Sequence, residues 1–137
     1  MTMRVVIDTN VFISSFFGGI PRQIIDHWFS GKFTLCVSRP ILKEYFDVLG
    51  RFQFEREDFF GRLINAFEKG PNILYIDDPK EENWIKGDPA DNKFIACALS
   101  LHAEYIVSGD IHLKRAEKIG NVEIIPPREM LRLIETG

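Results

Sequence analysis

Apolar residues along the chain alternate between short continuous runs and longer stretches with a helical period. The short runs predict strands at residues 3–7, 33–37, 73–76, 105–107 and 122–125. Stretches in which apolar residues recur every three or four positions predict helices at residues 20–30, 41–49, 56–69 and 88–101, a short helix near 113–119 and a closing helix after 125. Strands and helices therefore alternate through the chain.

Capping and breaking residues support several of these boundaries. Asp8-Thr9-Asn10 follows the first strand with residue types that commonly begin helices, so this strand is expected to pass directly into a helix. Ser38 and Pro40 supply an N-cap and an early proline for the helix that follows them. Gly70-Pro71 ends the helix at 56–69.

This alternation predicts an α/β fold with a central, mostly parallel sheet of about five strands, covered by helices on both faces. Sheets of this kind bind ligands at the carboxyl ends of their strands. At 137 residues and without a repeat, linker or low-complexity segment, the chain is expected to form one domain covering residues 1–137.

Cysteine usage and charge narrow the class of protein. Cys36 and Cys97 lie far apart in apolar surroundings without a CxxC spacing, which is typical of buried thiols in a reducing compartment. No apolar run approaches the roughly 18 residues of a membrane span, so we expect a cytoplasmic protein. The net charge of −3 argues against nucleic-acid binding by bulk attraction, unless bound metal neutralises several carboxylates.

Asp91 is the most informative acidic residue. At 100° per residue it projects onto the same inward helix face as Ile95, Ala98 and His102, and Lys93 projects onto the opposite side. Because an unpaired buried charge is costly, a cation shared with other carboxylates explains this position. Alternatively, Asp91 favours the helix dipole in a helix capped by the aspartate three residues before it.

Three further acidic residues stand where they could complete a metal site. Asp8 and Asp110 follow predicted strands, and Glu44 borders the apolar arc of its helix. Taken singly, Asp8 could begin a helix, Asp110 could belong to a turn and Glu44 could be solvated. One metal site explains the inward helix aspartate and both strand-end aspartates together. Oxygen ligands without histidine or cysteine favour one or two Mg²⁺ or Mn²⁺ ions.

In four segments the chain resembles the PIN domain family of metal-dependent nucleases. The segments are VVIDTNVFISSFF, ILKEYFDVL, DPADNKFIACAL and YIVSGDIHL. The resemblance implies a three-layer α/β/α fold and an acidic cluster that binds metal and acts in catalysis. It also implies small polar residues beside that cluster. The acidic positions are Asp8, Glu44, Asp91 and Asp110, and the small polar positions are Thr9, Asn10 and Ser108.

The same resemblance implies an activity and partners. Small prokaryotic members are largely VapC-like toxins of toxin–antitoxin pairs, so an endoribonuclease acting on single-stranded RNA, an antitoxin protein and a homodimer are expected. Basic residues near the site would bind the substrate, and the candidates are Arg39, Lys43, Lys93 and Lys114. The alternative is a non-catalytic RNA- or protein-binding module on the same fold. A haloacid dehalogenase-like phosphotransferase is disfavoured because Asn10 stands where a second aspartate is needed.

Overall fold

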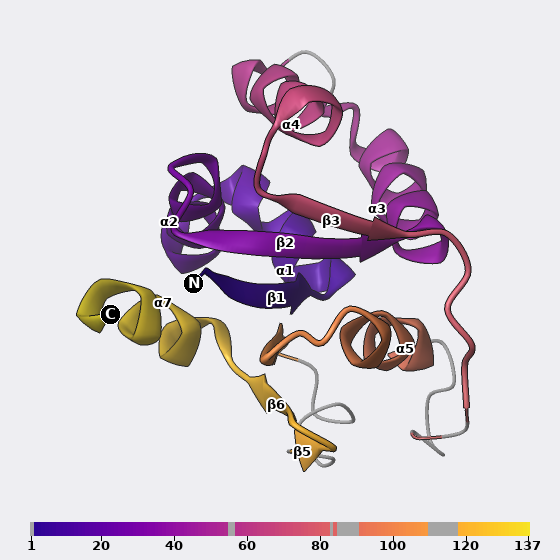
Figure 1. Ribbon diagram of the computed structural model, residues 1–137. Helices are drawn as coiled ribbons and strands as arrows, with labels where there is room; N and C mark the ends of the chain where they lie inside the picture. Colours follow the sequence, from indigo (N-terminus) through magenta and orange to yellow (C-terminus); the bar gives the residue numbers. More distant parts are fainter. Residues whose placement is uncertain (1, 55–56, 83, 85–90, 110–117) are drawn as a thin grey trace.

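The structure of the chain is a computed structural model that describes residues 2–54, 57–82, 84, 91–109 and 118–137. Within these residues the centre is a six-stranded sheet with the order β3-β2-β1-β4-β6-β5 (Figure 1). The strands are β1 (Met3–Ile7), β2 (Phe33–Ser38), β3 (Ile73–Ile76), β4 (Tyr105–Val107), β5 (Lys118–Ile119) and β6 (Val122–Ile125). All neighbouring pairs are parallel except β5 and β6. The predicted α/β class with a mostly parallel sheet is confirmed.

The sixth strand, β5, corrects the helix predicted near 113–119. Lys118 and Ile119 pair in antiparallel register with Glu123 and Val122, while residues 113–117 lie outside the described part of the chain. Gly120 begins the two-residue turn between these strands with φ of 59°. This left-handed backbone suits a tight hairpin, so turn chemistry decides the local structure where an apolar period suggested a helix.

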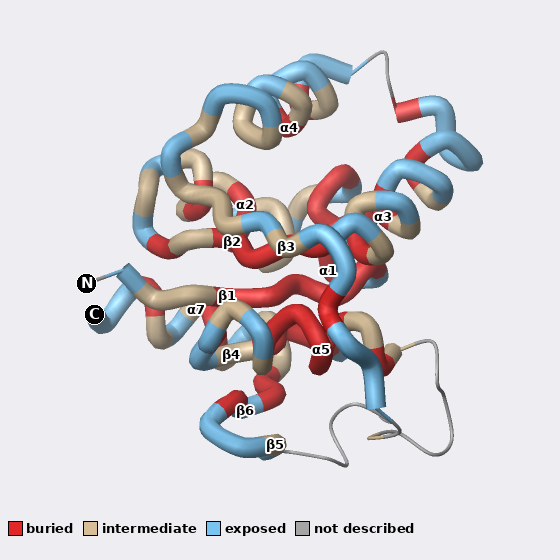
Figure 2. Tube along the Cα trace, turned by 45° about the vertical axis from the view of Figure 1, so that its right-hand side comes forward, coloured by how far each residue is buried: buried red, intermediate tan, exposed pale blue. Residues whose placement is uncertain are grey.

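Helices cover both faces of the sheet. The last three residues of β1, Val5, Val6 and Ile7, are all fully buried although successive strand side chains point to opposite faces. Figure 2 shows the buried parts of β1 and α5 in the interior of the molecule. The helical elements are α1 (Thr9–Ser14), the 3₁₀ helix η1 (Ser15–Phe17), α2 (Gly19–Phe29), α3 (Arg39–Phe52), α4 (Asp58–Lys69), α5 (Asn92–Ser100) and α7 (Pro127–Thr136).

Helix α3 is fixed to the end of β1. Ser38 caps it as predicted, because the Ser38 hydroxyl accepts a hydrogen bond from the backbone N–H of Ile41 at 3.3 Å. The Tyr45 ring stacks on Phe12 with centroids 4.0 Å apart, and its hydroxyl donates to the carbonyl of Ile7. Burial raises the pKa of Tyr45 well above its usual value, so the phenol stays neutral and keeps this hydrogen bond.

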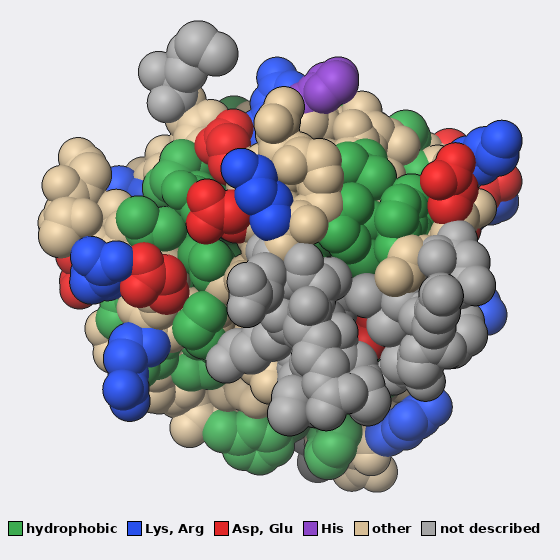
Figure 3. Space-filling model, turned by 90° about the horizontal axis from the view of Figure 1, so that it is seen from below, with side chains coloured by type: hydrophobic (Ala, Val, Ile, Leu, Met, Phe, Trp, Pro, Cys, Tyr) green, Lys and Arg blue, Asp and Glu red, His purple; other side chains and the backbone are tan. Residues whose placement is uncertain are grey.

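Helix length and the distribution of charge on one face characterise the described part of the chain. Among the described residues, no helix combines the length and apolarity that crossing a bilayer requires. On the face shown in Figure 3, the described basic, acidic and apolar side chains are interspersed.

Two aromatic side chains are exposed beside each other. Phe17 is 71% exposed and Phe52 is 51% exposed, and their ring centroids lie 6.4 Å apart. These two residues form an exposed aromatic pair on α3 and η1.

Candidate active site

Asp8 lies at the carboxyl end of β1 and is 3% exposed. Its Oδ1 accepts a hydrogen bond from the backbone N–H of Val11 at 2.9 Å and thereby caps α1. Its Oδ2 accepts a hydrogen bond from the Ser108 hydroxyl. The helix-capping explanation for Asp8 is therefore correct, and the same side chain also borders a pocket.

Parallel pairing places Ser108 beside Asp8. Ile7 and Val107 are register partners in β1 and β4, and the backbone N–H of Asp8 donates to the carbonyl of Val107 at 3.0 Å. Ser108 comes next in the chain and is fully buried. The predicted site residue Asp110 follows two positions later and lies outside the described residues.

Asp91 occupies the N-cap position of α5 and is half-buried. Its side chain accepts no capping hydrogen bond from the first turn of this helix, so the described residues do not support a purely capping role. Asp88, the proposed cap of the alternative explanation, lies outside the described residues. The predicted alignment with His102 is wrong, because α5 ends at Ser100 and His102 is exposed with φ of 56°.

Glu44 connects α3 to both α1 and α5. One of its carboxylate oxygens accepts a hydrogen bond from the Thr9 hydroxyl. The other accepts one from Nζ of Lys93 at 2.7 Å. The Glu44 and Lys93 side chains are 31% and 17% exposed, respectively. Glu44 therefore lies in the pocket wall with both oxygens bound to protein donors, and is not a fully solvated glutamate.

The prediction that Lys93 points away from the Asp91 side of the helix is wrong. Both residues line the same pocket. The projection at 100° per residue holds only inside a helix, and Asp91 precedes the first residue of α5. The long lysine side chain also reaches across to α3. A cation is therefore present beside the acidic residues, where the sequence pattern indicated none.

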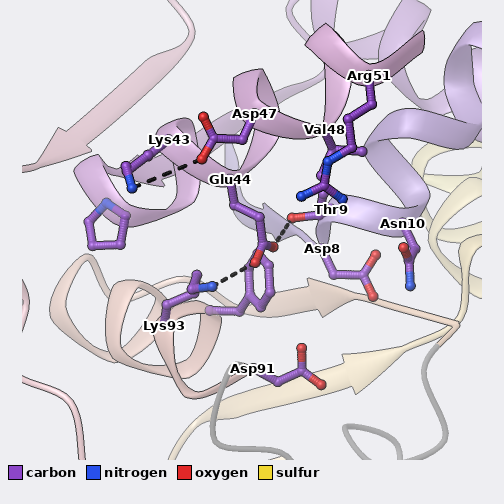
Figure 4. A pocket seen from close by; sticks show the side chains of 12 residues that line it. Asp8, Thr9, Asn10, Lys43, Glu44, Asp47, Val48, Arg51, Asp91 and Lys93 are labelled. Atoms are coloured by element: carbon purple, nitrogen blue, oxygen red, sulfur yellow. Dashed lines mark hydrogen bonds and ion pairs between the residues drawn. The ribbon is translucent and has the colours of Figure 1, made fainter.

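These side chains surround an open pocket of about 560 Å³ near the carboxyl ends of β1 and β4 (Figure 4). In Figure 4 the Asp8 carboxylate lies beside the Asn10 side chain, the Asp91 carboxylate lies below both, and Glu44 is directed toward Lys93. Thr9 and Asn10 come from the first residues of α1. The charged lining consists of Asp8, Glu44, Asp47 and Asp91 together with Lys43, Arg51 and Lys93.

Sequence reasoning missed two charged residues of this pocket, Asp47 and Arg51. They follow Glu44 by three and seven positions in α3, and residues at such spacing share one face of a helix. Once Glu44 is placed in the site, its helical spacing identifies both. Neither residue follows a strand or interrupts an apolar face, so neither had a separate signal.

The predicted substrate-binding residues do not all lie at the pocket. Lys43 and Lys93 line it. Arg39 does not, because its exposed guanidinium forms ion pairs with Asp77 at 3.8 Å and Asp78 at 3.9 Å. Lys114 lies outside the described residues.

The donor set fits a hard divalent cation. Asp8 and Asp91 contribute carboxylates, and the neighbouring Thr9, Asn10 and Ser108 add only oxygen or amide groups, the chemistry that Mg²⁺ and Mn²⁺ prefer. Within the described ranges, no three His, Cys, Asp or Glu side chains already stand at metal-binding spacing. Asp110 lies beyond those ranges.

Comparison with known proteins agrees with this fold. Residues 4–112 match the sequence profile of the PIN domain family. The uncharacterized protein MJ1680 of Methanocaldococcus jannaschii is 33% identical over 147 aligned positions, which cover 97% of this chain and 92% of that protein. The crystal structure of PAE2754 from Pyrobaculum aerophilum superposes with a TM-score of 0.61 and 13% identity, covering 99% of this chain and 91% of that chain. At this identity the structural likeness concerns the fold.

Proposed function

Since the chain belongs to the PIN domain family, whose members are generally metal-dependent nucleases, we propose that it is an Mg²⁺- or Mn²⁺-dependent endoribonuclease. Its reaction would be hydrolysis of phosphodiester bonds in single-stranded RNA. The observation that supports this most is the meeting of Asp8 and Asp91 in one pocket at the carboxyl end of the sheet.

Asp8, Asp91 and Asp110 would hold one or two metal ions in this proposal. A bound ion supplies Lewis acidity and positive charge at the scissile phosphate. The protein prepares one ligand in advance, because Ser108 and the first turn of α1 fix the Asp8 carboxylate. Asn10 is directed into the same part of the pocket, where its amide can orient water or a phosphate oxygen.

The basic residues of the pocket would counter the charge of the RNA backbone. Lys43 and Arg51 are exposed, so they suit attraction of the substrate at the rim. Lys93 lies deeper, with its side chain 17% exposed. Hydrolysis by water needs no covalent intermediate, and no nucleophilic side chain is required in this site.

Cleavage of a labelled single-stranded RNA tests the proposal. We expect cutting with Mn²⁺ or Mg²⁺ that stops on addition of EDTA. Asp8→Asn and Asp91→Asn should each slow it by at least about 100-fold, equivalent to roughly 2.7 kcal/mol of activation free energy. Asp78→Asn provides a matched control, because Asp78 is exposed and does not line the pocket. RNA binding without cleavage under any metal would favour the non-catalytic binding module.

Partners and localisation follow from the family resemblance. We propose that the chain is a VapC-like toxin, cytoplasmic, homodimeric and held in check by an antitoxin protein. The exposed aromatic pair Phe17 and Phe52 supports a protein contact, and the unpaired buried Cys36 and Cys97 agree with a reducing compartment. Light scattering of the purified chain tests the dimer, and Phe17→Ser with Phe52→Ser should yield monomers if this pair lies in the interface.

A further inference from the structure

Glu44 forms an ion pair with Lys93, whose ammonium group lies 2.7 Å away in the wall of the pocket. Its two oxygens accept hydrogen bonds from the Thr9 hydroxyl and from Nζ of Lys93. In Figure 4 the Asp8 carboxylate points toward Asn10 and away from Lys93, and the Asp91 carboxylate lies apart from the pair of Glu44 and Lys93. A metal ion bound directly to Glu44 would share this carboxylate with the Lys93 ammonium group, and the two cations would repel each other at such short range. The geometry therefore separates Glu44 from the proposed metal ligands.

The ion pair between Glu44 and Lys93 is also the most deeply buried one among the described residues. Its side chains are 31% and 17% exposed. Every other ion pair between described residues has both side chains at least 36% exposed. Breaking such a pair leaves a partly buried charge without its partner, so the pair fixes the position of the lysine.

The fixed ammonium group can still bind an anion. An ammonium has three hydrogen-bond donors, and Glu44 accepts one of them. Lys93 lines the pocket that also contains Asp8 and Asp91. The alternative cation Lys43 is 78% exposed and lies 4.0 Å from Asp47, so it is a less ordered phosphate-binding group.

We propose that Lys93 binds a phosphate of the RNA inside the pocket and that Glu44 positions Lys93 instead of binding the metal. This inference rests on the proposed function, because it takes RNA as the substrate. The pocket then has two parts, a metal-binding part at Asp8 and Asp91 and a phosphate-binding part at Lys93. Glu44 is a positioning residue in this arrangement.

The salt dependence of RNA binding tests the role of Lys93. Binding is measured by fluorescence anisotropy in EDTA, so that no cleavage occurs, across a range of salt concentrations. Loss of one phosphate contact lowers the slope of log K against log salt by about 0.7 for single-stranded RNA. We expect this decrease in Lys93→Met and Lys93→Gln, and a wild-type slope in Lys93→Arg.

The matched control for this measurement is Lys69→Met. Lys69 is an exposed residue at the end of α4, before β3 begins and outside the pocket. An unchanged slope in a folded Lys93→Met or Lys93→Gln protein would overturn the proposed phosphate contact.

Mn²⁺ affinity, measured by titration without RNA, tests the role of Glu44. Asp91→Asn should weaken binding by at least about tenfold, and Glu44→Gln should weaken it clearly less. A loss in Glu44→Gln equal to that in Asp91→Asn would overturn the inference and make Glu44 a metal ligand. Absence of Mn²⁺ binding by the wild type would refute the proposed metal site, while the salt slope would still decide the role of Lys93.

Comparison of two Glu44 variants isolates positioning from charge. Glu44→Gln and Glu44→Ala remove the same charge, but only glutamine can still accept a hydrogen bond from Lys93. We expect kcat to fall about tenfold further in Glu44→Ala than in Glu44→Gln, with a smaller difference in KM. Equal kcat values for the two variants would contradict a positioning role.

Discussion

Asp8 uses its two carboxylate oxygens for different contacts, which separates its contributions to stability and to the site. An asparagine at this position can still accept the hydrogen bond from the backbone of Val11, whereas an alanine cannot. Without metal, Asp8→Asn should keep the unfolding free energy within about 1 kcal/mol of the wild type or raise it, because it removes a buried charge.

Urea unfolding in EDTA measures this difference. Asp8→Ala should lose about 1 kcal/mol or more through the lost cap. If Asp8→Asn were instead the less stable of the two variants, the cap would not depend on the side-chain oxygen, and this account of Asp8 would fail.

Because two of its thiols are buried, the folded chain is expected to lose stability at alkaline pH. Burial raises the pKa of Cys36 to about 11 and that of Cys97 to about 12, from 9.0. Below pH 9 both thiols are protonated in the folded and the unfolded chain, so their contribution is fully present. As pH rises from 9 toward 11 and 12, the unfolded chain ionises first, and stability falls by up to about 1.4 kcal/mol per pH unit for each thiol.

Denaturant unfolding between pH 8 and pH 11 checks this loss of stability. Thiol labelling at pH 8 gives an independent check, because protonated and fully buried thiols react slowly. Rapid labelling of both cysteines in the folded chain would show that they are accessible and would remove the basis of the prediction.

Single residues also show what the sequence could reveal about the site. Asp8 was identifiable because it follows a predicted strand, and Asp91 because it projects onto an apolar helix face, and both line the pocket. Asp47 and Arg51 had neither signal, since they lie on the polar side of α3. The side-chain direction of Lys93 depends on where α5 begins and on its partner in α3, and neither is encoded locally.

At the level of elements, α3 positions a large part of the pocket, and its attachment to β1 matters for the site. Tyr45→Phe removes the hydrogen bond to the carbonyl of Ile7 and leaves the stacking on Phe12. We expect a loss of roughly 1–2 kcal/mol in unfolding free energy, because a buried carbonyl loses its partner. Catalytic activity should fall as well, because Glu44 precedes Tyr45 in the helix.

Thermal or urea unfolding of Tyr45→Phe, compared with the neighbouring surface variant Phe46→Leu, separates this effect from general changes in α3. Phe46 is 36% exposed and has no such hydrogen bond among the contacts of the described residues. Equal stability of Tyr45→Phe and the wild type would mean that water replaces the phenol at Ile7.

Elements were predicted well where periodicity and caps agreed, as in β1, α3 and β6. Prediction failed at β5, where two residues form a strand only because they pair with β6 across the turn at Gly120. Pairing of this kind is a tertiary contact. The apolar pattern of a few residues cannot distinguish a strand that forms by such pairing from a helix.

For the whole molecule, charge is the reason why the proposed cleavage of RNA would need a metal. The chain has a net charge of −3, and Asp8, Glu44, Asp47 and Asp91 all line one pocket. An RNA phosphate is repelled from such a site unless cations offset the carboxylates. Lys43, Arg51 and Lys93 supply part of the positive charge. The alternation of strands and helices along the entire chain was sufficient to predict a mostly parallel sheet. It therefore also predicted the edge of the sheet at which this pocket lies.

The most direct test of the account is the chemistry of the cut ends after incubation of single-stranded RNA with the chain and Mn²⁺. Attack by water predicts products without 2′,3′-cyclic phosphate and continued cleavage when the 2′-hydroxyl at the cut site is replaced by hydrogen. Asp91→Asn should yield no such products. Cyclic phosphate ends, or equal product from Asp91→Asn, would contradict a metal-dependent hydrolytic site at Asp8 and Asp91.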